Sequence, residues 1–227
     1  MTALFDMDGT LFAGDSQMRF ARFILRRHGW RRLYLLFVLP CGLLRALRLM
    51  NTPLMKRAFL AYAWGLTVEQ LEEEAAAFVQ GELIPAIFPE LRERLEAHQR
   101  AGDTTILCSA SPDWWVQLFG RALGFTHVIG TPITSYEKRV PLLPTIPPPG
   151  NNKGENKLKR LSAIGITHAE LGYTDSKADL PMLSICERAV LVNPKPSLAA
   201  QVPGADIIRT REQLDMLPFL LRCLVGA

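Results

Sequence analysis

The pattern of hydrophobic and polar positions divides the chain into short apolar runs and long helical stretches. Residues 2–6 form an apolar run that ends at a carboxylate, which is typical of a buried strand. Helical patterns separate most of the later runs, so we predict an α/β fold in which helices cover a Rossmann-like parallel sheet. The further strands are predicted at residues 104–108, 127–129, 133–143 (split by a turn at 137–139), 170–174, 189–192 and 206–208.

One long helical region interrupts this alternation directly after the first strand. Residues 14–66 are rich in Leu, Ala, Phe and Arg. Residues 67–80 begin with a capping-box signal, in which Thr67 is followed three positions later by Gln70. Because no strand pattern lies within this region, it is expected to form a separate layer of helices.

Shorter helices are expected around the later strands. Residues 90–100 read as a charged amphipathic helix that leads into the second strand. After that strand, Ser111 is a predicted N-cap and Pro112 the first helical position of a helix that continues through Leu123. A basic helix is predicted to begin near Lys153.

The length of the chain allows one sizeable α/β core and a smaller inserted unit. The 227 residues are 48% hydrophobic, and no long low-complexity run indicates disorder. We predict a core domain that comprises residues 1–13 and 96–227. A helical cap, residues 14–95, is inserted after the first strand.

Two carboxylates stand at the end of the first predicted strand. Asp6 and Asp8 leave the strand together, Gly9 permits a tight backbone turn close to a ligand, and Thr10 follows directly. Ligands collect at the carboxyl ends of strands in parallel α/β sheets. One carboxylate can attack phosphorus while the other transfers a proton to the leaving oxygen. A lone acidic pair would suit an ordinary turn, but the Gly-Thr sequence favours the catalytic interpretation.

Three further groups of polar residues occupy comparable places. Ser109 and Ala110 follow the second strand, where a hydroxyl and freed backbone amides can hold phosphate oxygens. Lys157 can supply a fixed positive charge. Asp175 ends an apolar strand and Asp179 lies one helical turn later, and such hard oxygen ligands suit Mg²⁺. Each group alone has an ordinary explanation as a helix cap, a solvated lysine or an acidic helix start.

The order of these four motifs along the chain resembles the haloacid dehalogenase superfamily of phosphotransferases. The motifs are DxDGT, a serine at a strand end, a downstream lysine and DSxxD, and together they span most of the sequence. The resemblance implies that Asp6 is the nucleophile that forms an aspartyl-phosphate and that Asp8 is the general acid and base. It also implies that Ser109, Ala110 and Lys157 bind phosphate.

The same resemblance implies a magnesium site. Asp6, Asp175 and the backbone carbonyl of Asp8 would hold Mg²⁺, while Asp179 would support Lys157 or the metal shell. The metal and the lysine are needed because an anionic carboxylate and a phosphate dianion repel each other. Because Asp8 can protonate an alkoxide leaving group, it favours a phosphatase over a dehalogenase.

The helical insertion resembles that of the subgroup containing phosphoserine phosphatases. Finer features are similar to the bacterial phosphatidylglycerophosphatase C type: the stretch LRRHGWRR, the apolar run LYLLFVLPCGLL, a Gly-x-x-Lys motif and a Tyr-Thr-Asp-Ser motif. This resemblance implies a lipid-borne phosphomonoester such as phosphatidylglycerophosphate as substrate. Arg19, Arg22 and Arg26 are candidate substrate contacts in the cap, although their spacing also suits a solvated helix face.

Charge is distributed unevenly along the chain. The net charge is +4, but residues 11–60 contain ten Lys or Arg against one acid. The uncharged run at 33–44 is too short to span a bilayer, which takes ~20 residues, yet it can lie in an interface with arginines meeting anionic headgroups. We therefore expect an anionic membrane surface to bind residues 19–57. A helix pair buried inside the cap is the alternative, and the sequence leaves both open.

Two other functional classes remain. The first is a phosphatase for a soluble metabolite such as phosphoserine or a sugar or polyol phosphate. The second, a non-catalytic module that binds membranes or nucleic acid, is disfavoured by the Asp6 and Asp8 pair. The basic stretch is interleaved with aliphatic residues and has no nucleic-acid reading motif, so no nucleic-acid partner is expected.

The N-terminus and the cysteines bear on localisation. Asp6 and Asp8 lie where a cleavable signal would need an uncharged apolar stretch. The cysteines are scattered without paired spacing, which indicates a reducing compartment. We expect a cytoplasmic protein that can associate peripherally with the cytoplasmic face of the inner membrane.

Overall fold

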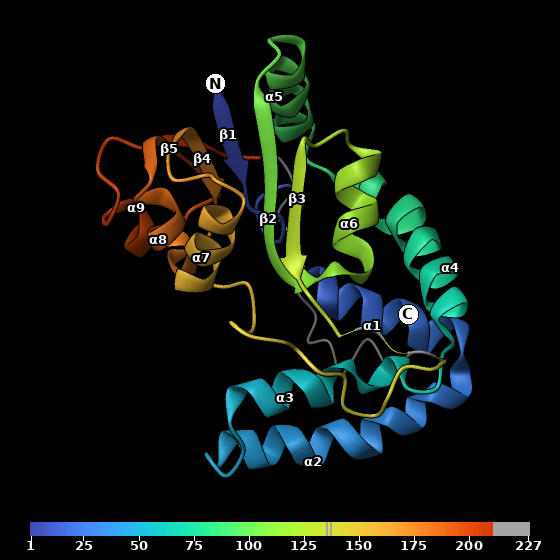
Figure 1. The fold of residues 1–227 in the computed structure, drawn as a ribbon. Helices are drawn as coiled ribbons and strands as arrows, with labels where there is room; N and C mark the ends of the chain where they lie inside the picture. The colour runs from blue at the N-terminus through green and yellow to red at the C-terminus, as the bar shows by residue number, and fades with distance from the viewer. Residues whose placement is uncertain (135, 137, 211–227) are drawn as a thin grey trace.

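Six parallel strands form one sheet in the computed structural model, which describes residues 1–134, 136 and 138–210 (Figure 1). The strand order is β3-β2-β1-β4-β5-β6, and each neighbouring pair is parallel. This confirms the predicted α/β fold. The strands are β1 (Thr2–Phe5), β2 (Thr104–Pro112), β3 (His127–Thr131), β4 (Ala169–Thr174), β5 (Cys186–Val192) and β6 (Asp206–Ile208).

The register of the three central strands sets the position of the functional edge. Phe5 of β1 pairs with Leu107 of β2 on one side and with Tyr173 of β4 on the other. Because the strands are parallel, the residues that follow these three positions emerge at the same edge of the sheet.

The chain between β1 and β2 is helical, and no strand lies between Phe5 and Thr104, all of which the structure describes. A helical insertion after the first strand is therefore present, while its limits at residues 14 and 95 stay a prediction. The helices there are α1 (Ser16–Arg27), α2 (Tyr34–Ala46), α3 (Thr52–Phe59), α4 (Val68–Phe78) and α5 (Pro89–Arg100). Those after β2 are α6 (Asp113–Ala122), α7 (Glu155–Ala163), α8 (Leu180–Leu183) and α9 (Pro196–Ala199).

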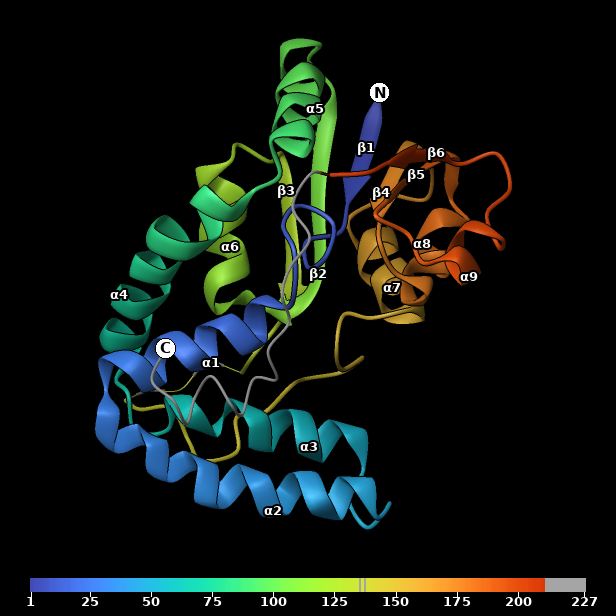
Figure 2. The same cartoon turned by 180° about the vertical axis from the view of Figure 1, so that it is seen from behind.

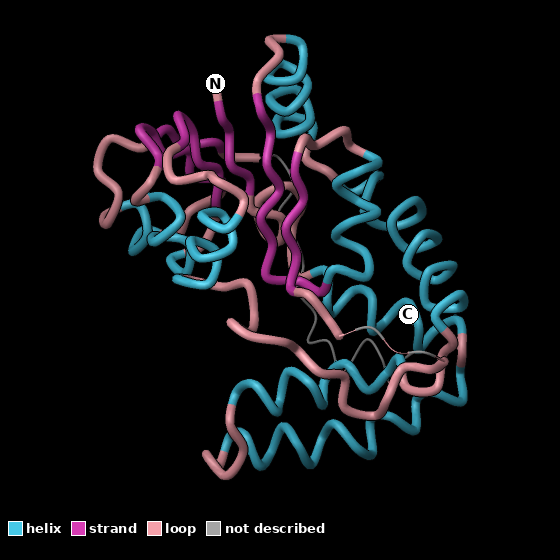
Figure 3. Tube along the Cα trace, in the orientation of Figure 1, coloured by secondary structure: helices cyan, strands magenta, loops and turns pink. Residues whose placement is uncertain are grey.

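The inserted helices surround the functional edge. Both views show α1 and α3 beyond the carboxyl ends of the strands, with α2 on the side of α3 that faces away from the sheet (Figures 1 and 2). Helix α4 packs along α6, and α5 returns the chain to β2. Helices α7, α8 and α9 cover one face of the sheet, and α5 and α6 cover the other (Figures 1 and 3).

Local sequence signals explain where several of these helices begin. The predicted capping box is confirmed, since the Thr67 side chain accepts a hydrogen bond from the Gln70 amide and the Gln70 side chain accepts one from the Thr67 amide. Asp15 caps α1 and Asn51 caps α3 through one hydrogen bond each, in which the side chain accepts from the Met18 and the Leu54 amide, respectively. These caps supply acceptors for amides that have no partner within the helix.

The hydrophobic core lies on both faces of the sheet and extends into the inserted helices. Leu4 packs on one face in a cluster with Leu161, whereas Phe5 points to the other face and stacks on Tyr173 with ring centroids 4.2 Å apart. The Phe5 cluster is continuous with side chains from α1 to α4, such as Phe20. A shared core holds the inserted helices firmly against the sheet.

The predicted strand at 133–143 is wrong. Within this range the described residues, which exclude 135 and 137, form no strand, and their one pairing is an isolated bridge between Arg139 and Thr67. The Val140 amide donates instead to the Leu66 carbonyl. The segment thus runs along the inserted helices rather than extending the sheet.

Two predicted helix starts are displaced. Ser111 is not an N-cap but part of β2, and α6 begins at Asp113 without a side-chain cap. The helix predicted near Lys153 begins at Glu155, after Gly154 adopts a positive φ of 59°. The first difference matters for function, because it frees the Ser111 hydroxyl for another partner.

The described residues give two facts that bear on localisation, the state of the cysteines and the character of the helices. Among these, Cys41, Cys108 and Cys186 are free thiols, and Cys223 lies outside them. In the same part of the chain, no helix combines the length and apolar character needed to cross a bilayer.

Candidate active site

A cavity of about 490 Å³ at the carboxyl ends of β1, β2 and β4 collects most of the predicted site residues. These are Asp6, Asp8, Gly9, Ala110, Lys157, Asp175 and Asp179. Residues of the inserted helical region and of the loop before α7 close it from the other side: Gly14, Asp15, Gln17, Lys56, Asn151 and Lys153. The structure therefore brings together side chains that are up to 173 positions apart along the chain, as Asp6 and Asp179 are.

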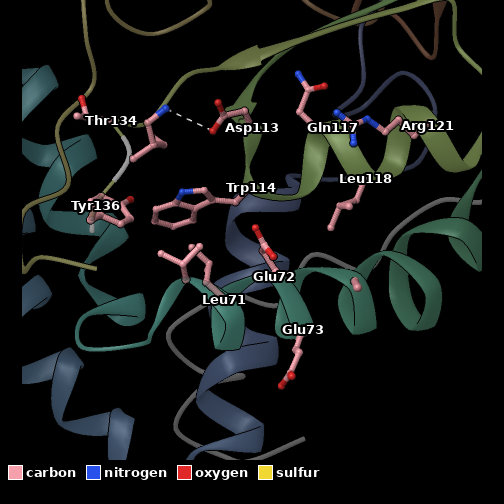
Figure 4. Close-up of a pocket in the computed structure, with 13 residues that line it drawn as sticks. Leu71, Glu72, Glu73, Asp113, Trp114, Gln117, Leu118, Arg121, Thr134 and Tyr136 are labelled. Carbon is pink, nitrogen blue, oxygen red and sulfur yellow. Dashed lines mark hydrogen bonds between the residues drawn. The ribbon is translucent and has the colours of Figure 1, made fainter. Parts of the chain in front are cut away.

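A larger cavity of about 700 Å³ lies between α4 and α6 and contains none of the predicted site residues (Figure 4). Its walls include Leu71, Trp114 and Leu118, with acidic Glu72 and Asp113 among them. Cavity size therefore does not identify the functional site in this molecule, and the arrangement of reactive groups must do so.

Lys157 lies between two carboxylates on the floor of the smaller cavity. Its Nζ is 2.6 Å from Asp6 Oδ1 and 2.8 Å from Asp179 Oδ1, and its side chain is only 1% exposed. The Thr174 hydroxyl donates to the other oxygen of Asp179 at 2.8 Å. Burial lowers the pKa of Lys157, but Asp6 and Asp179 outweigh this and hold its pKa above the usual value. The ammonium group is therefore charged and fixed beside Asp6.

Thr10 and Gly9 bring the carboxylates of Asp6 and Asp175 together. Thr10 Oγ1 is 3.2 Å from Asp6 Oδ2 and 3.5 Å from Asp175 Oδ1, and it accepts a hydrogen bond from the Asp175 amide at 3.1 Å. Gly9 has a φ of 81°, and a Cβ there would lie 2.2 Å from Asp175 Oδ2. Only glycine allows this close approach.

Hydrogen bonds fix Asp8 between the start of α1 and the end of β2. Its Oδ1 accepts from the Ser16 amide at 2.7 Å, and its Oδ2 accepts from the Ser111 hydroxyl at 2.6 Å. The Ser16 hydroxyl in turn donates to Ser111 Oγ and accepts from Trp115 Nε1. This chain orients the Asp8 carboxyl at the edge of the cavity.

The carboxyl groups are held at unusual pKa values. Burial raises the pKa of Asp6 to about 6, although Lys157 opposes the shift. Burial and the nearby charge of Asp15 raise the pKa of Asp8 to about 7. Burial and the charge of Asp6 raise the pKa of Asp175 to about 7. Lys157 alone does not balance this negative charge.

The donor set fits the predicted Mg²⁺. Asp6 and Asp175 offer hard carboxylate oxygens at one strand edge, where uncompensated negative charge favours a divalent cation. Across the described residues, no group of three or more His, Cys, Asp or Glu side chains could hold a metal by itself. The predicted magnesium ligands are the side chains of Asp6 and Asp175 and the backbone carbonyl of Asp8. Because one ligand is a backbone oxygen, this site does not require three side-chain ligands.

Ser109 and Ala110 were expected to follow the second strand, but they lie within β2, where its pairing with β3 shifts register. Ser109 is wholly buried, and its hydroxyl accepts a hydrogen bond from the Ser111 amide at 3.1 Å. Its role as a phosphate ligand stays a prediction. Ala110 lines the cavity, and its carbonyl accepts from Lys56 Nζ and from Thr131 Oγ1, each at 2.7 Å.

Lys56 is the principal cavity residue that sequence reasoning did not single out. It extends from α3 to Ala110 and Asn151, and burial lowers its pKa to about 8. In the sequence it is one of ten basic residues in a stretch assigned to membrane contact. No local signal separates it from its neighbours, because only the packing of α3 over the sheet edge directs it inward.

The three predicted arginine contacts lie outside the cavity. Arg19 donates to the Ala13 carbonyl at 2.6 Å and lies over the Phe12 ring. Arg26 pairs with Glu82. Arg22 lies on the same helix, partly buried. None of the three lines the cavity, so the geometry gives no support to substrate contact.

Comparisons with known proteins agree with this geometry. The chain is 28% identical to a histidinol-phosphatase of Neisseria meningitidis serogroup C, over 86% of this chain and 91% of that protein. A protein of unknown function from Bordetella pertussis Tohama I has the same fold, with a TM-score of 0.75, 22% identity and coverage of 91% and 97% of the two chains. A substrate-bound phosphoserine phosphatase superposes with a TM-score of 0.57 at 16% identity, covering 91% of each chain.

These findings support the broad family and leave one finer resemblance unconfirmed. They support phosphoserine phosphatase-like structural neighbours, as expected from the helical insertion, but they do not confirm the resemblance to phosphatidylglycerophosphatase C. The haloacid dehalogenase-like hydrolase family matches residues 3–184, a range that contains every predicted catalytic and metal-binding residue. This chain belongs to the haloacid dehalogenase-like hydrolases.

Proposed function

We propose that the protein is a Mg²⁺-dependent phosphomonoesterase in which Asp6 forms an aspartyl-phosphate. The observation that carries the proposal is the buried Lys157, held 2.6 Å from Asp6 and 2.8 Å from Asp179. A fixed cation beside a strand-end carboxylate can bind a phosphoryl group and reduce its repulsion from the nucleophile. The nearby Asp8 supplies the second group that the chemistry needs.

The first half of the reaction transfers the phosphoryl group to the protein. An oxygen of Asp6 forms a bond to phosphorus while the bond to the ester oxygen breaks, and Asp8 gives its proton to the leaving alcohol. The hydrogen bonds from Ser16 and Ser111 hold Asp8 in place for this transfer. A pKa of about 7 lets Asp8 carry a proton at neutral pH.

The second half regenerates the carboxylate. Asp8, now ionised, takes a proton from water, the water oxygen attacks phosphorus, and the bond to Asp6 breaks to release inorganic phosphate. When bound by Asp6, Asp175 and the Asp8 carbonyl, Mg²⁺ would offset the negative charge of phosphate and carboxylate. Asp179 keeps Lys157 oriented toward the phosphoryl group.

The polar lining of the cavity supports a leaving group with hydroxyl or charged substituents. Lys56, Gln17 and Lys153 line the cavity, where they can contact the alcohol part of the substrate. Small metabolite phosphates match this chemistry, and the relatives named histidinol-phosphatase and phosphoserine phosphatase act on such compounds by name. We therefore place soluble phosphomonoesters first.

A lipid-borne phosphomonoester is the second candidate. A glycerol phosphate headgroup has the same polar chemistry at the reacting end, so the cavity itself does not separate the two classes. The specific observation in its favour is a row of exposed leucines on α2, including Leu36 and Leu43. Such a row suits a protein that works next to a bilayer.

The test is phosphate release from a panel that contains histidinol phosphate, phosphoserine, sugar phosphates and phosphatidylglycerophosphate in mixed micelles. We expect turnover that requires Mg²⁺ and falls below about one thousandth of wild type in Asp6→Asn. Activity that survives in Asp6→Asn would overturn the mechanism. The ranking of the substrates within the panel decides between the soluble and the lipid-borne class.

A further inference from the structure

Helix α2 exposes large apolar side chains to an unusual degree. Leu36 is 73% exposed and Leu43 62%, and the residues directly before and after the helix, Leu33 and Leu47, are 65% and 59% exposed. Of the other exposed large hydrophobic side chains among the described residues, several belong to the same region: Trp30, Leu39, Leu44, Leu49, Trp64 and Leu142. Single exposed apolar residues are normal in folded proteins, but a continuous group marks an interaction surface.

The exposure follows from the position of the helix. The inner side of α2 is buried through Tyr34, Leu35 and Val38, which pack in the main core. Side chains at helical spacing on the opposite side, such as Leu36 and Leu43, point outward. Because α2 lies on the side of α3 away from the sheet, no helix or strand of the described chain covers its outer side (Figures 1 and 2).

An apolar groove adjoins the start of this surface. Its volume is about 300 Å³, and it lies among Trp30, Leu33, Phe37, Trp64 and Leu142. Trp30 and Trp64 are each more than half exposed at its margin. Indole rings that contact apolar groups on one side and water on the other favour the headgroup level of a bilayer.

The charged side chains of the stretch of chain that carries the surface have one sign. Residues 16–68 contain no Asp or Glu, whereas exposed arginines lie at both ends of α2, with Arg32 before it and Arg45 and Arg48 at its end. Apolar side chains flanked only by cations complement a surface that is apolar inside and anionic outside. A nucleic acid would meet the cations but leave the leucines in water.

We propose that this surface docks on an anionic lipid bilayer, with α2 lying in the plane of the interface. The docking surface comprises Trp30, Arg32, Leu33, Leu36, Leu39, Leu43, Arg45, Leu47 and Arg48. At thirteen residues α2 is too short to cross the membrane, so its leucines enter the boundary between headgroups and acyl chains. The proposal goes beyond the phosphatase activity and does not depend on it, because docking needs no substrate.

The first test is sedimentation with vesicles of phosphatidylglycerol and phosphatidylcholine, without substrate. Wild type and Asp6→Asn are expected to bind alike, so a failure of the catalytic proposal would not affect the result. Leu36→Ser combined with Leu43→Ser is expected to lower binding at least tenfold at an unchanged melting temperature. The matched control, Ile164→Ser with Ile207→Ser, changes two exposed apolar residues elsewhere and should bind as wild type.

The second test concerns charge. Arg32→Gln with Arg45→Gln should weaken binding to the anionic vesicles by about 30-fold, at about 1 kcal/mol for each arginine, and leave the weak binding to pure phosphatidylcholine unchanged. Arg94→Gln with Arg100→Gln, which removes two exposed arginines of α5, should have no comparable effect.

Two outcomes would overturn the proposal. One is wild-type protein that stays in the supernatant with anionic vesicles. The other is loss of binding to the same extent in the leucine variant and in its isoleucine control. A third result would point to a different partner. If the wild type does not bind vesicles but forms dimers, and the double variant Leu36→Ser with Leu43→Ser is monomeric, then a second copy of the chain covers the surface and the bilayer proposal is wrong.

Discussion

The catalytic cavity and the outer side of α2 both reverse the usual distribution of side chains, but in opposite ways. In the cavity, charged groups such as Asp6, Lys157 and Asp179 are almost completely buried. On α2, large apolar groups such as Leu36 and Leu43 are mostly exposed. Either arrangement costs stability relative to an ordinary core and surface.

The two regions differ in how this cost is offset. In the cavity, Lys157 pairs with two carboxylates, and hydroxyl groups of Thr10, Thr174 and Ser111 saturate further oxygens. The described chain supplies no such compensation on α2. The comparison teaches that the buried charges of the cavity find partners within the chain, whereas the exposed leucines of α2 find none in the described chain, which is the reason for proposing an external partner there.

The largest effect is expected for Asp8→Asn. The amide oxygen can still accept from the Ser16 N–H and its NH₂ group can donate to the Ser111 hydroxyl, but the amide cannot transfer a proton, so kcat should fall about 10²–10⁴-fold while the fold persists. Steady-state kinetics and circular dichroism would measure both. Asp206→Asn, which changes an exposed acid on β6, serves as control. Equal kcat values for the two variants would remove Asp8 from the mechanism.

Lys157→Met tests whether the buried charges depend on one another. Without the ammonium group, Asp6 and Asp179 are left buried with no cation, and the free energy of unfolding should drop by about 3–5 kcal/mol. Denaturant unfolding measures this. Lys159→Met changes an exposed lysine on the same helix and should stay within about 0.5 kcal/mol of wild type. Similar stability in both variants would contradict the assigned pairing.

The raised carboxyl pKa values predict a pH dependence of stability in metal-free protein. Asp6, Asp8 and Asp175 have folded pKa values of about 6 to 7, above the 3.8 of a free aspartate, so the folded state binds more protons than the unfolded state. The free energy of unfolding should therefore decrease as pH rises from about 4 to about 7. Thermal unfolding across this range should show the decline, and saturating Mg²⁺ should reduce it. A stability that rises with pH in the absence of metal would contradict the burial of these groups.

Lys56→Met should change substrate recognition without changing the chemical step. Lys56 lines the cavity from α3, where the substrate's alcohol part is proposed to lie, so its loss should raise KM about tenfold for substrates with a polar leaving group, with kcat little altered. The same measurement on Lys56→Arg should show partial rescue. A fall in kcat with unchanged KM would instead place Lys56 at the reacting phosphoryl group.

The smallest effect on stability is expected for a substitution on the exposed side of α2, and it tests directly whether that side lacks a partner within the chain. Leu36→Ala should leave the free energy of unfolding within about 0.5 kcal/mol of wild type, because this side chain contacts mainly solvent. The adjacent Leu35 is buried, and Leu35→Ala should cost about 2–5 kcal/mol. Denaturant unfolding of both variants provides the test. A large loss in Leu36→Ala would show that another part of the chain covers the surface.

For the apolar run at 33–44, the sequence alone could not predict which side chains are buried and which are exposed. Its composition suited both an interfacial helix and a buried helix pair, and the structure contains elements of each. Leu35 and Val38 are core residues, whereas Leu36 and Leu43 are exposed. A run that is apolar on every side carries no periodicity, so only the position of α3 decides which side is buried.

The chemistry of the site could be predicted, but its positioning residues could not. Asp6, Asp8 and Asp175 belong to local patterns that occur after apolar strands, Lys157 was predicted from the order of the motifs along the chain, and the structure places all four at one cavity. Ser111 carried a stronger local signal as a helix cap than as a partner of Asp8. Its actual partner lies 103 positions earlier, and no local pattern encodes such a contact.

The sequence by itself determined the parallel α/β fold, the helical insertion after the first strand and the carboxylates at the strand ends. These depend on periodicity, capping and short motifs, which act over a few residues. Only the tertiary structure decided that Lys56 enters the cavity, that Arg19 and Arg26 do not, and that one side of α2 stays exposed. Those outcomes depend on how helices pack against one another, which local composition does not specify.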